Sequence, residues 1–249
     1  SFGEQRLASP TMLGRTFVAE VGGIAISDRP NAATLHALRA LVHRHGVLVV
    51  RGQGLLSDQA LAEFAAGWGQ LFTPAGGGFG AEAVSPIIRI GNLDAEGRIR
   101  PADDDYRKAN DPNAFWHIDN TFSEPPAKYS MLLARIAPQS GGETEFASTY
   151  AAYEGLPEDE KRDLEGLKAV HSVKASLSPI ADAIPEKHRE KVLGIGLIKE
   201  HPLVWTHESG RKSMVIGTTA DHIVGKTVPE GRAMLVRLQE WAAQPAYSL

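Results

Sequence analysis

The sequence has no cysteine among its 249 residues. This absence excludes disulfide bonds, thiolate catalysis, and zinc or iron–sulfur sites that depend on cysteine. Long hydrophobic runs are also missing, because no apolar stretch approaches the roughly 20 residues that span a bilayer. The chain also lacks a large excess of charge of either sign, because its formal net charge is only −4. The chain therefore gives no reason to expect nucleic acid or an anionic membrane as a partner.

The residues that are present are typical of a globular protein. Hydrophobic residues make up 43% of the chain and charged residues 22%. This length suits one large domain, residues 1–249, with a substantial core. The first residues, from Ser1 to Glu4, contain no Met and no basic-then-apolar signal pattern. We therefore expect a cytoplasmic enzyme, and the missing Met suggests that the chain has been trimmed.

Apolar spacing predicts helices near both ends of the chain. Residues 30–45 carry apolar side chains at helical intervals, with Asn31 as the expected N-cap and Gly46 as the C-cap. Ser57 is expected to cap a second helix that continues to about Trp68. Two further helical regions are predicted, over residues 149–167 and 229–243.

Short apolar or alternating runs between Gly- and Pro-rich turns predict strands. They fall in residues 16–26, 47–50, 87–90, 115–122, 128–136, 143–147, 201–207 and 212–216. The Gly-rich residues 74–86 are expected to form a loop that could act as a lid, and the polar residues 171–199 an insertion outside the core. The pattern favours a mixed α+β, mainly β, fold: a sandwich or jelly roll with flanking helices.

The strongest functional pattern lies in the predicted strand at residues 115–122. Residues two apart on a strand share a face, so His117 and Asp119 are expected to project side by side. An imidazole and a carboxylate so placed are two ligands of a facial 2-His-1-carboxylate Fe(II) site, which leaves positions open for a co-substrate and O2. The His-x-Asp pattern alone is weak, because such pairs more often serve as ordinary hydrogen-bonding pairs.

An ordered series of segments resembles the taurine/2,4-dichlorophenoxyacetate dioxygenases, a family of Fe(II)- and 2-oxoglutarate-dependent oxygenases. The segments are VVRGQ at 49–53, NAFWHID at 113–119, PAKYSML at 126–132, GGETEFA at 141–147, HPLV at 201–204 and GRKS at 210–213. The resemblance runs from about residue 14 to the end and is greatest to the phenoxyacetate-degrading branch, which residues 92–97 also suggest. It implies a double-stranded β-helix (jelly roll) core with flanking helices.

The resemblance also implies roles for individual residues. His117 and Asp119 correspond to the first two iron ligands, and Thr144 to a residue that hydrogen-bonds a 2-oxoglutarate carboxylate. Asn113 would lie near the co-substrate or substrate, and Asn120 would line the substrate pocket. Simpler interpretations exist: Thr144 as an exposed strand residue, and Asn113 as a turn residue after a proline.

One expected part of the family pattern has no counterpart before Leu249. It comprises the second histidine ligand and the arginine that pairs with the distal carboxylate of 2-oxoglutarate. One interpretation is that both lie in C-terminal strands beyond the end of this sequence. The other is that an in-chain histidine completes the site, with His201, His207 and His222 as candidates.

The resemblance implies hydroxylation of a small carboxylate such as an aryloxyalkanoate, giving a phenol and glyoxylate with release of succinate and CO2. Asp119 favours hydroxylation, because a small residue replaces this carboxylate in related halogenases. A sulfonate such as taurine, or an N-acyl amino acid, is an alternative substrate. A non-catalytic, metal- or ligand-binding β-helix module is the alternative class. The expected partners are the small-molecule substrate, O2 and, in a homo-oligomer, further copies of the chain.

Overall fold

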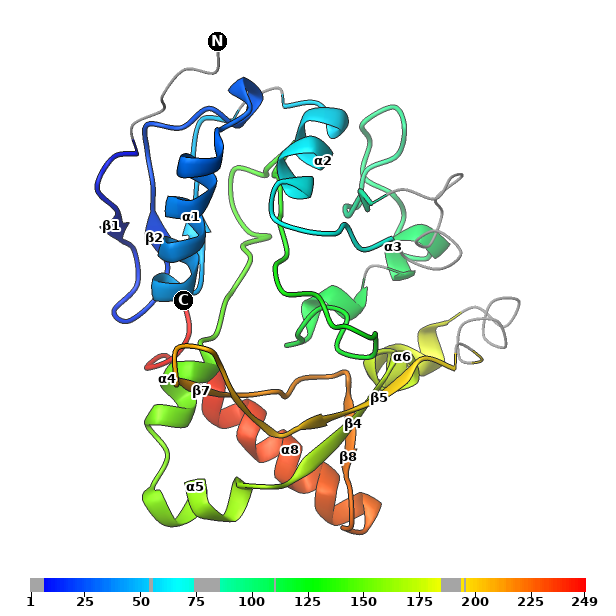
Figure 1. The fold of residues 1–249 in the computed structure, drawn as a ribbon. Coiled ribbons are helices and arrows are strands. Elements are labelled where there is room, and N and C mark those ends of the chain that lie inside the picture. The colour runs from blue at the N-terminus through cyan, green and yellow to red at the C-terminus, as the bar shows by residue number, and fades with distance from the viewer. Residues whose placement is uncertain (1–6, 54–55, 74–85, 110, 185–193, 195) are drawn as a thin grey trace. The chain divides into compact units, whose positions relative to one another are not determined.

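The computed structural model describes residues 7–53, 56–73, 86–109, 111–184, 194 and 196–249. The chain forms two compact units. The first comprises residues 1–88 and 131–148 together with Leu249, and the second comprises residues 89–130 and 149–248. Both units combine helices with irregular segments, and both contain short strands (Figure 1).

The first unit contains a small three-stranded sheet in the order β1-β2-β3. β2 pairs antiparallel with β1 and parallel with β3, and the long helix of the β2–β3 crossover is α1. The elements of this unit are β1 (Thr11–Met12), β2 (Ala19–Glu20), η1 (Ile26–Asp28), α1 (Ala32–His45), β3 (Leu48–Val49) and α2 (Asp58–Ala66).

Side-chain caps define both helices of the first unit, as the sequence predicts. The Asn31 side chain accepts a hydrogen bond of 2.9 Å from the backbone N–H of Thr34 at the start of α1. Gly46 ends this helix with a φ of 72°, in the region that glycine adopts most readily. At the start of α2, Ser57 accepts a hydrogen bond of 3.1 Å from the N–H of Ala60.

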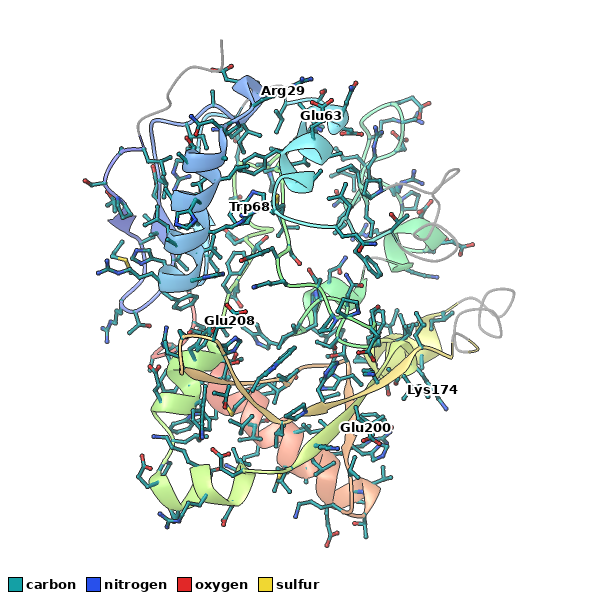
Figure 2. The ribbon with its side chains drawn as sticks, in the orientation of Figure 1. Arg29, Glu63, Trp68, Lys174, Glu200 and Glu208 are labelled. Carbon is teal, nitrogen blue, oxygen red and sulfur yellow. The ribbon has the colours of Figure 1, made fainter. Side chains whose placement is uncertain are left out.

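A surface pocket of about 330 Å³ lies between η1, α1 and α2 of the first unit. Its lining is largely apolar, and Arg29 and Glu63 form an ion pair of 2.7 Å at this pocket (Figure 2). Both side chains are well exposed, so the pair contributes little to stability. None of the residues that line this pocket belongs to the predicted site.

The second unit has a larger sheet and a hairpin. The sheet has the order β5-β4-β8 with antiparallel pairs, and the hairpin joins β6 to β7. Its elements are α3 (Asp105–Ala109), η2 (Asp111–Ala114), α4 (Thr149–Glu154), α5 (Glu158–Leu164), β4 (Lys168–Ser172), α6 (Val173–Leu177), η3 (Ser178–Ala183), β5 (Ile198–Pro202), β6 (Val204–Thr206), β7 (Lys212–Met214), β8 (Ala220–Ile223) and α8 (Val228–Ala242).

The main core of the second unit lies between α8 and the strands (Figure 1). Leu203, Met214, Ile223 and Leu238 are completely buried in it. Helix and sheet approach closely at Gly231, where an added Cβ would lie 2.7 Å from the backbone nitrogen of Ile223. This contact explains why a glycine occupies the buried face of α8, where it would otherwise lower helix stability.

The predicted helices are confirmed, but several predicted strands are wrong. The regions 149–167 and 229–243 contain α4, α5 and α8, and the strands predicted in 201–207 and 212–216 form the hairpin β6–β7. In contrast, the structure has no strand in residues 87–90, 115–122, 128–136 or 143–147. Only a short β2 forms as a strand in 16–26, and the predicted strand in 47–50 is the half-buried β3. Alternation predicts which face a side chain takes, but a strand also needs a neighbouring backbone with which to pair.

The prediction that residues 171–199 lie outside the core is wrong for their first part. His171 and Ser172 end β4, the central strand of the larger sheet, and both are buried together with Ala175 and Leu177. His171 and Ser172 are buried because their side chains hydrogen-bond within the core, so polarity alone did not identify β4 as a core strand. Of the predicted loop at 74–86, residues 74–85 lie outside the described residues. In the part of the chain that the structure describes, no helix is long and apolar enough to cross a membrane.

Candidate active site

His117 and Asp119 face each other in the second unit. The Nε2 atom of His117 lies 3.3 Å from the Oδ1 atom of Asp119. Contrary to the strand prediction, the segment is irregular: η2 ends at Ala114, and a turn begins at Asp119. Asn120 has a left-handed φ of 55°, a conformation that asparagine tolerates better than most residues. The two side chains therefore meet through an irregular backbone and not through the pleat of a strand.

Two hydrogen bonds leave one atom of each side chain directed toward the other. The Nδ1–H of His117 donates to the carbonyl oxygen of Phe115 over 2.7 Å. The hydroxyl of Ser130 donates to Oδ2 of Asp119 over 2.6 Å. With these atoms occupied, Nε2 and Oδ1 remain to bind a shared ion. A backbone carbonyl on Nδ1 is a common way to fix the tautomer of a metal-binding histidine.

The electrostatics of the pair suit a cation. The hydrogen bond to Asp119 raises the pKa of His117, while burial opposes this shift. The same hydrogen bond lowers the pKa of Asp119, and the bond from Ser130 lowers it further. Without a metal, a proton between the two groups satisfies both of them. A metal ion binds the deprotonated imidazole and must displace this proton, so its affinity falls as the pH falls.

The connection between β7 and β8 packs against the backbone of this segment. The N–H of Thr218 donates to the carbonyl oxygen of Trp116 over 2.9 Å. An added Cβ at Gly217 would lie 2.9 Å from the Cα of His117 and 3.0 Å from the oxygen of Trp116. Gly217 also has a φ of 111°, which disfavours any side chain. The close approach therefore requires glycine at this position.

Comparison with known families shows the class of enzyme to which the chain belongs. Residues 9–249 match the model of the family described as "Taurine catabolism dioxygenase TauD, TfdA family". The chain belongs to this family.

Two relatives in the TauD/TfdA family are α-ketoglutarate-dependent 2,4-dichlorophenoxyacetate dioxygenases. The one from Burkholderia sp. (strain RASC) is 38% identical over 240 residues, which cover 93% of this chain and 78% of the relative. The one from Cupriavidus pinatubonensis (strain JMP 134 / LMG 1197) is 36% identical over 237 residues, covering 92% and 79%. The chain is an Fe(II)- and 2-oxoglutarate-dependent dioxygenase, as the resemblance implies.

Solved structures of the TauD/TfdA family are similar to the structure of this chain. The crystal structure of AAD-2 in complex with Mn(II) and N-oxalylglycine has a TM-score of 0.83 and 28% sequence identity, and the match covers 97% of this chain and 82% of that one. A taurine dioxygenase from Burkholderia xenovorans, with a TM-score of 0.64 and 22% identity, covers 97% and 74% and shares the fold.

The donor set of His117 and Asp119 fits the Fe(II) that TauD/TfdA enzymes use. One nitrogen and one carboxylate oxygen match two positions of the facial site. Among the described residues, no group of three His, Asp or Glu side chains could hold a metal. The three in-chain candidates have other contacts: His201 bonds to the oxygen of Thr121, His207 to Ser213 and His222 to Asp221. The structure therefore joins none of these candidates to the pair.

The remaining predicted site residues are placed as follows. Asn113 is exposed in η2, four residues before His117, and Asn120 is half-buried immediately after Asp119. Thr144 is exposed in an irregular part of the first unit. The roles of these three residues toward 2-oxoglutarate and substrate stay predictions.

Sequence reasoning missed two residues that shape the pair, Ser130 and Gly217. Ser130 lies within the segment 126–132 that carries part of the family resemblance, but the sequence did not indicate that its hydroxyl bonds to Asp119. A hydrogen bond between residues eleven apart in an irregular chain leaves no periodic signal. Gly217 carried no local turn signal, because the close approach that requires it is to a segment 100 residues away.

Proposed function

We propose that this dioxygenase hydroxylates a small carboxylate of the aryloxyalkanoate class. The support is the identity of 38% and 36% to two 2,4-dichlorophenoxyacetate dioxygenases over most of the chain. A (S)-phenoxypropionate/α-ketoglutarate-dioxygenase of Sphingobium herbicidovorans, 34% identical over 237 residues, adds to it. The observation that carries the proposal is this similarity combined with the His117–Asp119 pair, whose Nε2 and Oδ1 atoms lie 3.3 Å apart. We also propose that the core is a double-stranded β-helix, supported by the likeness to solved structures of the family.

Each residue of the site has a separate task in this proposal. His117 and Asp119 hold Fe(II) through Nε2 and Oδ1, while Ser130 keeps Oδ2 away from the ion. Thr144 hydrogen-bonds a carboxylate of 2-oxoglutarate, and Asn113 and Asn120 lie beside the co-substrate and substrate. When bound, Fe(II) and 2-oxoglutarate supply the oxidising power that inserts one oxygen atom of O2 into a substrate C–H bond, with succinate and CO2 as co-products.

The products follow from the position of the bond that is hydroxylated. Hydroxylation of the carbon beside the ether oxygen of an aryloxyacetate gives a hemiacetal. This hemiacetal collapses by breaking the C–O bond to the aryl ether oxygen, which leaves as a phenol, and the carbon fragment becomes glyoxylate. In the related halogenases, a small residue replaces this carboxylate and leaves room for a halide at the metal. Asp119 fills that position here, so an oxygen atom and not a halide is transferred to the substrate.

The test is coupled turnover by the full-length protein with Fe(II) and 2-oxoglutarate. Succinate and phenol should both appear with 2,4-dichlorophenoxyacetate, in equal amounts, and neither should appear when 2-oxoglutarate is omitted. Taurine, an alkyl sulfate ester and an N-acyl amino acid serve as competing substrates. Succinate release with one of these but not with any phenoxyacetate would overturn the substrate class and leave the reaction class intact.

Sulfate esters are included for a specific reason. An α-ketoglutarate-dependent sulfate ester dioxygenase of Pseudomonas putida is 34% identical over 226 residues, covering 89% of this chain and 70% of the relative. A sulfate ester and an aryloxyalkanoate both present an anionic group and an oxidisable carbon attached to oxygen. The second candidate function is therefore the same hydroxylation on a sulfate ester.

A further inference from the structure

Four polar side chains form a buried cluster in the second unit. Thr121, His171, Thr219 and His201 are exposed by only 1%, 0%, 3% and 6%. The hydroxyl of Thr121 donates to that of Thr219 over 2.8 Å, and Nδ1 of His171 lies 3.0 Å from each hydroxyl oxygen. Nε2–H of His201 donates to the carbonyl oxygen of Thr121 over 2.6 Å. Thr121 thus has both its hydroxyl and its carbonyl oxygen bound inside the core.

Two strands of the larger sheet and the turn before the third contribute to this cluster. His171 is on β4, His201 is on the paired strand β5, and Thr219 immediately precedes β8. The N–H of Ser172 also donates to the oxygen of Thr219 over 2.9 Å. The rings of the two histidines meet edge to face with centroids 5.4 Å apart. Paired strands therefore hold two partners of Thr121, His171 and His201, and the bond from Ser172 of β4 ties Thr219 to the sheet.

One arrangement of protons satisfies both hydroxyl groups of the cluster. Thr121 uses its hydroxyl proton on Thr219, so Thr219 can donate its own proton to Nδ1 of His171. This order leaves both hydroxyl protons bonded and makes Nδ1 the acceptor nitrogen of the neutral ring, while Nε2 of His171 is buried without a hydrogen-bond partner. Each bond has a fixed direction, so the cluster defines the position of Thr121 more narrowly than apolar packing would.

Thr121 follows Asp119 by two residues, and the same chain segment is held at its other end. There, the N–H of Thr218 bonds to the oxygen of Trp116, the residue before His117. Residues 218 and 219 are adjacent, so one short connection holds the segment 116–121 on both sides of the metal-binding pair. Between the two attachments the chain is irregular and includes the left-handed Asn120, so no ladder of backbone bonds sets its shape.

We propose that Thr121, Thr219, His171 and His201 are positioning residues that set the geometry of the His117–Asp119 pair. This inference rests on the proposed metal-binding role of the pair. The four residues do not contact the ion; they act through the backbone that carries its ligands. Outer partners of metal ligands typically change metal affinity about 10–100-fold when they are removed.

The test compares three substitutions in the full-length protein. Thr121→Val removes the hydroxyl and keeps the shape, Thr121→Ser restores the hydroxyl, and Leu164→Ala is a control for lost stability. Leu164 is completely buried in the core of the same unit and has no polar contact, so its truncation should destabilise the fold more than Thr121→Val does. Equilibrium binding of Co(II) and its visible absorption spectrum report affinity and coordination geometry without turnover.

We expect Thr121→Val to weaken Co(II) binding about 10-fold or more and to change the spectrum. Thr121→Ser should stay within about threefold of wild type, and Leu164→Ala should bind Co(II) normally wherever it is folded. In metal-free protein, amide hydrogen exchange in residues 116–121 should accelerate in Thr121→Val and not in Leu164→Ala. This second readout does not need a metal.

Two results would overturn the proposal. One is normal Co(II) affinity and spectrum in Thr121→Val. The other is equal losses in Thr121→Val and Leu164→Ala, which would reduce the cluster to a contribution to stability. If wild-type protein fails to bind Co(II), the proposed metal site is wrong, and hydrogen exchange in residues 116–121 still decides whether the cluster holds this segment.

Discussion

In the proposed metal site, Ser130 and the carbonyl of Phe115 determine which atoms of His117 and Asp119 are free to face the ion. Each carboxylate has two equivalent oxygens and each neutral imidazole has two possible tautomers, so an isolated His-x-Asp pair is ambiguous. A bond of 2.6 Å from Ser130 occupies Oδ2, and a bond of 2.7 Å to Phe115 occupies Nδ1. The pair is thereby prepared as one nitrogen and one oxygen donor before any ion arrives.

Loss of the Ser130 hydroxyl should therefore weaken metal binding more than it weakens the fold. We expect Ser130→Ala to lower the affinity for Fe(II) or Co(II) by about 10-fold, within the range for outer partners of metal ligands. The measurement is equilibrium metal binding under anaerobic conditions. Ser209→Ala, in the exposed turn between β6 and β7, is the matched control and should bind normally. Equal affinities for the two variants would mean that Ser130 does not select the oxygen of Asp119.

His171 should make the stability of the protein depend on pH. Burial lowers its pKa from 6.5 to about 4, and the neighbouring His201 adds to the shift. Between these two pH values, His171 binds a proton in the unfolded chain but not in the folded protein. Its contribution to the free energy of unfolding is therefore fully present above pH 6.5 and declines as the pH falls toward 4. A shift of this size corresponds to about 3 kcal/mol in total, of which about 2 kcal/mol is lost by pH 5.

Urea unfolding of wild type and His171→Asn at pH 7.5 and pH 5 measures this contribution. Asparagine does not ionise, so the stability advantage of wild type over the variant should shrink by about 2 kcal/mol at the lower pH. If wild type and variant differ in free energy of unfolding by the same amount at both pH values, His171 does not titrate with a lowered pKa.

Single residues show what sequence reasoning can and cannot supply. The pattern His-x-Asp identified His117 and Asp119 as a pair, and the structure places them 3.3 Å apart. The reason given was a strand, which the structure does not contain there. The buried His171 was predicted to lie in an insertion outside the core, because a polar residue with its partners 48 and 50 residues away gives no local signal.

Among the elements, the connection from β7 to β8 matters most for the site. It places Gly217 against the backbone of His117 and Thr218 in a hydrogen bond with Trp116. The elements themselves are short, so the connections between them carry much of the geometry.

Gly217→Ala should displace this connection from the ligand segment. Its Cβ would clash with the backbone at 2.9 Å, and the φ of 111° is strained for alanine. Gly210→Ala is a matched control, because Gly210 also has a positive φ of 80° but has no atom within 4 Å of an added Cβ. Positive φ alone costs roughly 1–2 kcal/mol, which both variants share. Only Gly217→Ala should also weaken metal binding, and normal binding by both would refute this role for the connection.

Helices were more predictable than strands for a physical reason. The caps Asn31, Gly46 and Ser57 act within a few residues of the sequence, and all three are confirmed. A strand depends on a partner that is distant in sequence. Residues 128–136 contain the apolar run of a predicted strand, yet the structure has no strand there. The parallel pairing of β2 with β3 could likewise not be predicted from either segment alone.

For the whole molecule, the order of motifs along the chain was more informative than the local pattern. The series of segments between residues 49 and 213 predicted the TauD/TfdA family, and the match over residues 9–249 confirms it. The jelly-roll core stays a proposal, since the structure itself shows helices mixed with two small sheets and a hairpin. The single domain, the cytoplasmic location and the homo-oligomer stay predictions.

The central claim is that His117 and Asp119 together bind the Fe(II) on which activity depends. Its most direct test is anaerobic Fe(II) binding by full-length wild type, His117→Ala, Asp119→Ala and, as a control on the exposed face of α1, His36→Ala. We predict that wild type and His36→Ala each bind one Fe(II) per chain. In the other two variants the affinity for Fe(II) should fall by more than the roughly 10–100-fold that removal of an outer partner causes. Unchanged binding by His117→Ala or Asp119→Ala, in folded protein, would contradict the claim.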